Sequence, residues 1–329
     1  MRTCPRSLWF DYATAIVSVW ITSGFFLDAW AHFNVPIETF FTPYHAMFYS
    51  GIFAMIALLA AYWLRHRGLP PGYRFAMLGI PVFLLAGIGD LTWHTLLGIE
   101  QGVDAVMSPT HQALGVGIAI LSSGPIGSVL ADRANSKTLR TQLPFVLSLA
   151  AWLTLAHFAT SYVFDPGAGR TGIPIVQGTL APVYDKIAIG ALVTIFQSVL
   201  MSAFALWMVG RIRLAPGSFT IFYVLGNISI AWAFTNQSPL LATTLVQSLV
   251  AGIVADALVA RYDPSPERPG AYRIFAIGVP LAYAGAYLLS TALRDGLWWD
   301  ANEAFGVWMS CGIAGFALSL IGTARFTPS

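Results

Sequence analysis

The apolar residues of this chain fall in long blocks separated by short polar segments. Each block holds roughly 20 mostly apolar residues, the length that crosses the hydrocarbon core of a bilayer as a helix. The pattern therefore predicts ten membrane-spanning helices, at about residues 11–33, 41–64, 74–98, 108–131, 142–164, 182–210, 217–236, 238–260, 271–293 and 301–325.

The polar segments between the blocks are rich in proline, glycine and charged residues, as in residues 65–72 and 263–270. Such segments are typical of turns between helices. The seventh and eighth blocks are separated only by residues 236–239. A single re-entrant element there is therefore an alternative to two helices, and it would change both the helix count and the side on which the C-terminus lies.

A repeat is visible within this pattern. Residues 72–81 resemble residues 270–280, and each segment begins a predicted helix after a Pro-Gly turn. Internal duplication is a reasonable way to build a membrane bundle. We therefore interpret the chain as a series of helical hairpin repeats, with a four-helix unit at residues 1–131 and a six-helix unit of degenerate repeats at residues 132–329.

The composition supports this class. The chain is 57% hydrophobic and 10% charged, whereas an ordinary soluble domain is about 25% charged. The predicted fold is all-α, a polytopic integral membrane protein whose first partner is the lipid bilayer. The net charge of +2 gives no reason to expect a nucleic-acid partner. Cys4 and Cys311 are far apart and suggest neither a disulfide framework nor a thiolate metal site.

The basic residues predict the orientation. With the N-terminus in the cytoplasm, fourteen of the 17 lysines and arginines lie on the cytoplasmic side, and only Arg170, Lys186 and Arg294 lie opposite. Positively charged loops are retained in the cytoplasm. We therefore expect both termini to be cytoplasmic, and we place the protein in a bacterial inner membrane.

One arrangement of ionisable residues occurs twice. In its first copy, Asp28 and His32 are four residues apart on a predicted helix, so their side chains share a face. Thr42-Pro43 then predicts the start of the next helix, with threonine as N-cap and proline as first helical residue. His45 falls in the first turn of that helix. We call Asp28, His32 and His45 the first triad.

The second copy has the same order. Asp90 and His94 are again four residues apart, and Ser108-Pro109 predicts another helix start that places His111 in a first turn. We call Asp90, His94 and His111 the second triad. Both triads fall at the predicted outer ends of their helices.

Ionisable side chains within a bilayer are energetically expensive and normally functional. Two imidazoles and a carboxylate, with positions left for water or substrate, suit copper, zinc or non-haem iron. A lone histidine in a membrane helix is more often a hydrogen-bonding group between helices, but the repetition favours a metal. Proton relay through Asp–His pairs uses the same residues. Glu100, in the loop before His111, either orients the imidazoles from the second shell or belongs to a solvated acidic loop.

The first triad lies in a motif that resembles a known family. An Asp-x-x-x-His followed by Phe-Thr-Pro-x-His, here residues 28–32 and 41–45 with the second histidine thirteen positions after the first, is similar to the C subunit of copper-dependent particulate methane and ammonia monooxygenases. The resemblance covers about residues 20–125. It implies copper at each triad and a monooxygenase subunit or relative, an oxidoreductase acting on a small apolar molecule. It also implies other membrane subunits or a homo-oligomer as partners.

The second triad departs from the family's pattern at two points. Asp90 stands where the family has asparagine, and the gap from His94 to His111 is longer than the family's.

Two other functions are alternatives to a copper monooxygenase subunit. The first is a transporter that moves protons or a metal ion through intramembrane Asp–His pairs, although the first four helices carry few ionisable residues between the triads and the cytoplasm. The second is a structural or assembly protein with degenerate sites.

Overall fold

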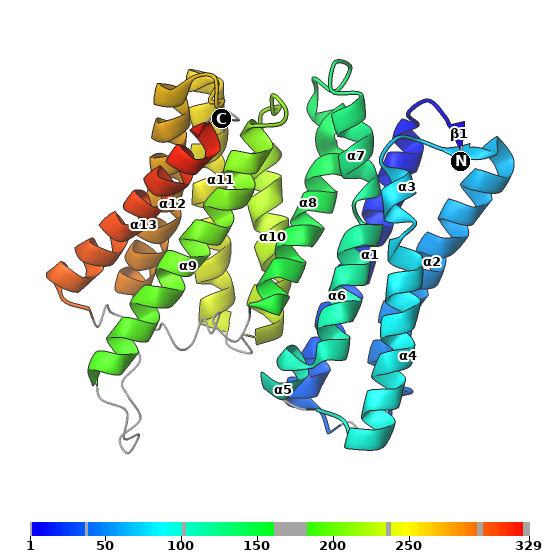
Figure 1. Ribbon diagram of the computed structural model, residues 1–329. Coiled ribbons are helices and arrows are strands. Elements are labelled where there is room, and N and C mark those ends of the chain that lie inside the picture. The colour runs from blue at the N-terminus through cyan, green and yellow to red at the C-terminus, as the bar shows by residue number, and fades with distance from the viewer. Residues whose placement is uncertain are drawn as a thin grey trace, which may run out of the picture. The chain divides into compact units, whose positions relative to one another are not determined.

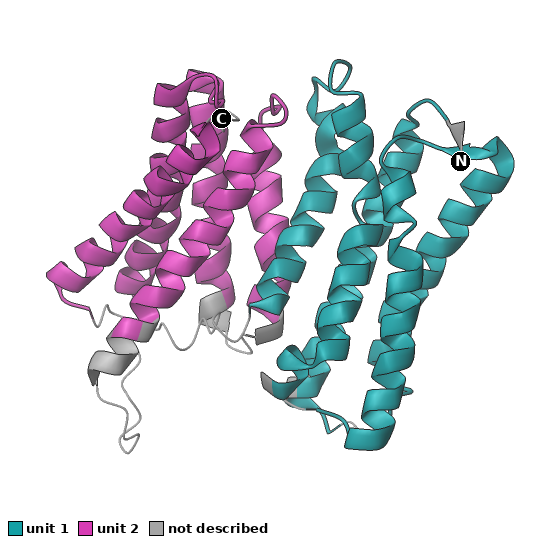
Figure 2. Ribbon diagram, in the orientation of Figure 1, with its two compact units in different colours: residues 1–162 teal, residues 163–329 magenta. Residues whose placement is uncertain are grey.

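The computed structural model describes residues 2–36, 39–100, 103–160, 183–234, 238–294 and 299–324. These residues form two compact units, Met1–Tyr162 and Val163–Ser329, shown in Figure 2. The first unit contains β1 (Arg2–Thr3), α1 (Leu8–Asn34), α2 (Pro43–His66), β2 (Gly68–Leu69), α3 (Tyr73–Ala76), α4 (Gly79–Leu97), α5 (Val103–Met107), α6 (Pro109–Leu121), α7 (Gly124–Ala131) and α8 (Leu139–Ala159). The second contains α9 (Val183–Val209), α10 (Ser218–Phe234), α11 (Ser238–Tyr262), α12 (Pro269–Arg294) and α13 (Ala301–Thr323).

The prediction of an all-α polytopic membrane protein is confirmed. Within the described residues, nine helical segments are long and apolar enough to cross a bilayer, two of them formed by α3 with α4 and by α6 with α7. The shorter apolar helix Ser218–Trp232 falls in the seventh predicted block. The chain at the seventh and eighth blocks forms two helices, α10 and α11, and residues 235–237 between them lie outside the described residues.

The compact units divide after residue 162, whereas the division drawn from the repeats falls at residue 131. Helix α8 accounts for the difference. It packs against α1, α6 and α7, all of which belong to the first unit. The four predicted helices that carry the triads are therefore joined by a fifth helix in one compact unit.

In the first unit, α1 contacts α2, α6, α7 and α8, and α4 packs along α6. Glycine allows two of these helix pairs to approach closely. A Cβ atom added to Gly24 on α1 would lie 2.8 Å from the Cα atom of Phe48 on α2, and one added to Gly117 on α6 would lie 2.9 Å from the Cα atom of Phe83 on α4. Each of these two helix pairs is therefore in close backbone approach at its glycine.

A buried ion pair between Arg6 and Asp11 lies at the end of the first unit that contains the start of α1. Asp11 is fully buried, and its carboxylate accepts hydrogen bonds from Arg6 Nε at 2.8 Å, the Tyr73 hydroxyl at 2.9 Å and Ser128 Oγ at 3.1 Å. These partners join α1 to α3 and α7. Beside them, β1 and β2 form a short parallel pair. The charge of Asp11 is thus compensated within the protein, as a buried carboxylate requires.

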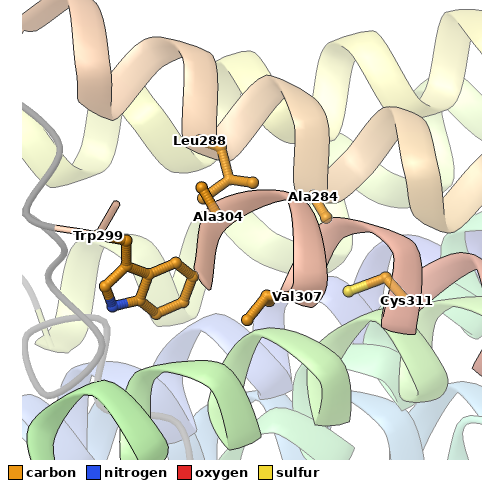
Figure 3. Packing of buried hydrophobic residues seen from close by; sticks show 6 residues of the cluster. All are labelled: Ala284, Leu288, Trp299, Ala304, Val307 and Cys311. Carbon is orange, nitrogen blue, oxygen red and sulfur yellow. The ribbon is translucent and has the colours of Figure 1, made fainter. Parts of the chain in front are cut away.

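In the second unit, the helix pairs α10–α11, α11–α12, α12–α13 and α9–α13 pack side by side. Part of the core lies between α12 and α13 and is drawn in Figure 3. Cys311 belongs to this apolar cluster and is a buried free thiol, and Cys4, in the first unit, is also free. The complete cluster comprises Ala284, Leu288, Trp299, Ala304, Val307 and Cys311.

Candidate metal centre

Asp11 lies in the first turn of α1 and the first triad at its other end, and His111 of the second triad is bonded to Ala105 of α5. Figure 1 shows where α5 lies in the first unit. Asp28 and His32 occupy the last turns of α1, and His45 lies in the first turn of α2. The predicted N-cap of α2 is confirmed, because Thr42 Oγ1 accepts a hydrogen bond from the His45 backbone N–H at 3.1 Å. The start of α2 therefore turns the His45 side chain toward α1.

In the first triad, one carboxylate oxygen faces two imidazole nitrogens. Asp28 Oδ2 lies 3.5 Å from His45 Nε2 and 3.7 Å from His32 Nε2. All three side chains are buried, with at most 7% of their surface exposed. The predicted same-face pair on α1 is confirmed, and the histidine of α2 completes it.

The second triad repeats this geometry. Asp90 Oδ1 lies 3.2 Å from His111 Nε2 and 3.5 Å from His94 Nε2. Asp90 also accepts a hydrogen bond from Thr110 Oγ1 at 2.8 Å, which holds the carboxylate against the start of α6. Pro109 is the first residue of α6 as predicted, although Ser108 makes no capping hydrogen bond to the helix backbone.

The outward-facing nitrogens of two histidines are bonded to backbone carbonyls. His32 Nδ1 lies 2.7 Å from the carbonyl oxygen of Glu100, and His111 Nδ1 lies 2.6 Å from that of Ala105. A carbonyl oxygen only accepts hydrogen bonds, so each Nδ1 must carry the proton. In the neutral imidazole, Nε2 then presents a lone pair toward the carboxylate.

The other two histidines are oriented by side chains. Glu100 Oε2 lies 2.9 Å from His94 Nδ1, and Thr42 Oγ1 lies 3.1 Å from His45 Nδ1. Glu100 thus lies beside the imidazoles. His32, His45 and His111 have a hydrogen-bonding partner at Nδ1, whereas the close contact between Glu100 and His94 Nδ1 does not have the geometry of a hydrogen bond. Each of the four histidines turns Nε2 toward a carboxylate.

The triads are not separate in space. The ring of His32 in the first triad lies 5.3 Å from that of His111 and 5.9 Å from that of His94, measured between centroids. Possible ligand atoms of His32, His45 and His94 all lie within 4.8 Å of one another, as do those of the second triad. The structure therefore gathers all six predicted ligand residues into one cluster, which we call the histidine cluster.

The histidine cluster has the properties of a cation site. Within the described part of the chain, Nε2 of His32, His94 and His111 is buried without a hydrogen-bond partner, as is one oxygen of each aspartate. A lone pair on Nε2 and a carboxylate oxygen repel each other unless a proton or a metal ion lies between them. These buried His and Asp groups could therefore hold metal.

A small cavity adjoins the cluster. It measures about 10 Å³, which is room for roughly one water-sized molecule. Its polar wall is formed by Asp28, His32 and His111. The other walls are apolar and come from α1, α5 and α8: Phe25, Ala29, Ala105, Val106 and Phe158.

Two aromatic residues near the site were not singled out from the sequence. Phe40 stacks on the His45 ring, with 4.7 Å between centroids and 23° between planes, while its neighbour Phe41, which belongs to the family motif, is 83% exposed. Phe158 reaches the cavity from α8, outside the segment that resembles the family. A run of two phenylalanines before Thr42 carries no signal for which ring faces the histidine.

Together, the fold and the site define a polytopic membrane protein with a buried histidine–carboxylate cluster able to hold metal. Comparison with protein-family models, curated proteins and solved structures finds no match for this chain. Its function is therefore argued from the cluster.

Proposed function

We propose that the histidine cluster binds two copper ions and that the protein is a membrane monooxygenase C-subunit relative. The observation that supports metal binding is the orientation of the imidazoles. The Nδ1 atoms of His32, His45 and His111 are hydrogen-bonded to the protein, and Nε2 of each of the four histidines faces an aspartate oxygen at 3.2 to 3.7 Å. A metal ion or an additional proton between these atoms makes the arrangement favourable, and the repetition of the triad favours the metal.

The two triads provide donors for two ions. Each aspartate faces the two histidines of its own triad, so each triad offers two imidazole nitrogens and one carboxylate oxygen. Because His32 lies close to the second triad, we infer that the two ions share one centre. The donor set also suits zinc or iron, and the resemblance of the first motif is what favours copper.

In this proposal the small cavity provides the open position that a reactive metal site needs. Bound copper would supply the redox chemistry for oxidation of a small apolar molecule. The protein presents Asp28 and His32 from α1 on the polar side of the cavity, and Phe25 and Phe158 line its apolar side. From the distribution of basic residues, we place the histidine cluster on the outer side of a bacterial inner membrane.

Metal content per chain tests the proposal. Purified wild-type protein, reconstituted with copper, is expected to retain about two ions per chain by elemental analysis. Asp28→Ala/His32→Ala and Asp90→Ala/His94→Ala should each lose about one ion if the positions are independent, or both if they depend on a shared centre. His66→Ala is the matched control, because His66 is an exposed histidine at the end of α2 and lies outside the cluster. A wild-type chain without bound metal would refute the proposal.

A second candidate function, translocation of protons or metal ions, is favoured by one observation. Buried polar residues follow α1 from the histidine cluster toward Asp11, at the spacing of one helix face: Thr22, Ser18 and Thr14. Their hydroxyls donate to the backbone carbonyls of Ser18, Thr14 and Phe10, respectively. These hydroxyls provide polar atoms between the histidine cluster and Asp11, where the sequence has few ionisable residues.

Flux through liposomes separates the two functions. A translocating protein should move protons or copper across the bilayer, and Ser18→Ala should slow that movement while leaving the metal content unchanged. If purified protein in sealed vesicles moves neither, translocation is excluded. The hydroxyls of α1 are then helix-packing groups, a common role in membrane helices.

A further inference from the structure

Glu100 contacts one histidine of each triad. Its backbone carbonyl accepts a hydrogen bond from Nδ1 of His32 on α1, at 2.7 Å. Its carboxylate oxygen Oε2 lies 2.9 Å from Nδ1 of His94 on α4. The two histidine rings are themselves stacked, 5.9 Å apart and inclined by 21°. One residue therefore orients two imidazoles that come from different hairpins.

The carboxylate of Glu100 is buried rather than solvated. Its side chain is 13% exposed, and both of its oxygens are inaccessible to solvent. Burying a carboxylate is unfavourable unless a partner compensates it. Asp104, in the same connection between α4 and α6, is exposed. Glu100 thus differs from an ordinary acidic loop residue. Its nearest ionisable group is the imidazole of His94, in close contact at 2.9 Å but without hydrogen-bond geometry.

Gly98 forms the turn that ends α4, two residues before Glu100. It ends α4 with φ 87° and ψ 174°, a conformation that is essentially restricted to glycine. Its N–H donates to the carbonyl of His94, so the turn begins at that histidine. Any side chain at this position would strain the turn, although nothing lies within 4 Å of an added Cβ atom.

We propose that Glu100 is a positioning residue for both triads, with its carboxylate fixing the ring of His94 and its carbonyl orienting His32. The inference rests on the proposed metal-binding function. It has an asymmetric consequence. Removing the side chain releases His94 alone, because the carbonyl remains, whereas displacing the backbone at Gly98 releases both histidines.

The test compares Glu100→Ala, Glu100→Gln and Gly98→Ala with two controls, Asp104→Ala in the same connection and Gly306→Ala on α13, where an added Cβ meets nothing within 4 Å. Copper affinity is measured for each position, and nitrogen-15 shifts of labelled histidines report the tautomers in the metal-free protein. Loss of an outer hydrogen-bonding partner typically weakens metal binding by about 10–100-fold.

Glu100→Ala is expected to weaken copper at the second triad by about that factor, to leave the first triad close to wild type, and to change the nitrogen shifts of His94 only. Glu100→Gln retains an acceptor and should largely restore both readouts. Gly98→Ala should alter His32 and His94 together. The controls should match wild type.

The inference is overturned if wild type binds copper and Glu100→Ala leaves both positions and the His94 shifts unchanged. It is also overturned if Glu100→Ala weakens both positions equally. A wild-type chain that binds no metal would instead refute the proposed function. In that case the histidine shifts alone decide whether Glu100 orients the two rings.

Discussion

Asp90 Oδ1 lies 3.2 Å from Nε2 of His111, although the two residues are on different helices and the far side of the imidazole is bonded to the Ala105 carbonyl. The proton that would be needed for a direct hydrogen bond to the aspartate is thus already used at Nδ1 in the neutral ring. A metal ion between Asp90 and His111, or a second proton on the ring, removes this conflict. Asp28 and His32, both on α1, are in the same situation, because His32 Nδ1 is bonded to the Glu100 carbonyl. Metal removal is therefore the most informative perturbation.

Removal of metal is expected to destabilise the protein. An ion that binds only the folded chain stabilises it by about 2.7 kcal/mol when its free concentration is 100 times the dissociation constant. Thermal unfolding in detergent should therefore occur at a lower temperature after chelation and recover when copper is restored. His111→Ala should show a smaller response to the chelator. An equal response in the variant would contradict a role for this histidine in binding.

Phe40 and Phe41 form a natural matched pair. Phe40 stacks on the His45 ring, whereas the Phe41 side chain is 83% exposed. Phe40→Ala should free the imidazole to rotate and reduce copper bound at the first triad, without altering the second. Phe41→Ala should leave both positions at the wild-type level. Metal titration of the two variants decides the matter, and equal effects would show that the stacking does not orient His45.

Gly24 is expected to be essential for the spacing of α1 and α2. A methyl group there would lie 2.8 Å from the Cα atom of Phe48, so the backbones must separate. Overpacking of this kind typically costs about 1–3 kcal/mol. Gly24→Ala should lower the unfolding temperature and weaken copper at the first triad, whose histidines face each other across these helices. Gly306→Ala, with open space around its Cβ, provides the control for the substitution itself.

The ion pair of Asp11 should contribute to stability and not to metal binding. Asp11→Ala leaves Arg6, whose side chain is 9% exposed, without its closest carboxylate. Removing one partner of a buried pair destabilises a protein by about 3–5 kcal/mol. We expect a large fall in unfolding temperature with unchanged copper per folded chain. Asp104→Ala, at an exposed aspartate, should change neither. Loss of copper from folded Asp11→Ala protein would instead link the two ends of α1.

Local features of the site could be predicted from sequence because they depend on helix geometry. Asp28 and His32 share a face since four residues span about one turn. Helix α2 begins at Thr42-Pro43 because the threonine hydroxyl accepts a hydrogen bond from an N–H of the first turn, and proline has no N–H that would need a partner there. The helices themselves follow from blocks of apolar residues long enough to cross a bilayer. These relationships involve neighbours along the chain, and the structure contains each of them.

Relationships between helices required the folded protein. The repeat of the motif suggested two sites, but packing of α1 against α2 and α6 brings His32 within 5.3 Å of the His111 ring and makes one cluster. The same packing selects Phe40 over Phe41 and adds Phe158 from α8. Glu100 acts through its backbone carbonyl as well as its side chain, and every residue type has that carbonyl. Such contacts depend on how distant helices pack, so no spacing within a single segment specifies them.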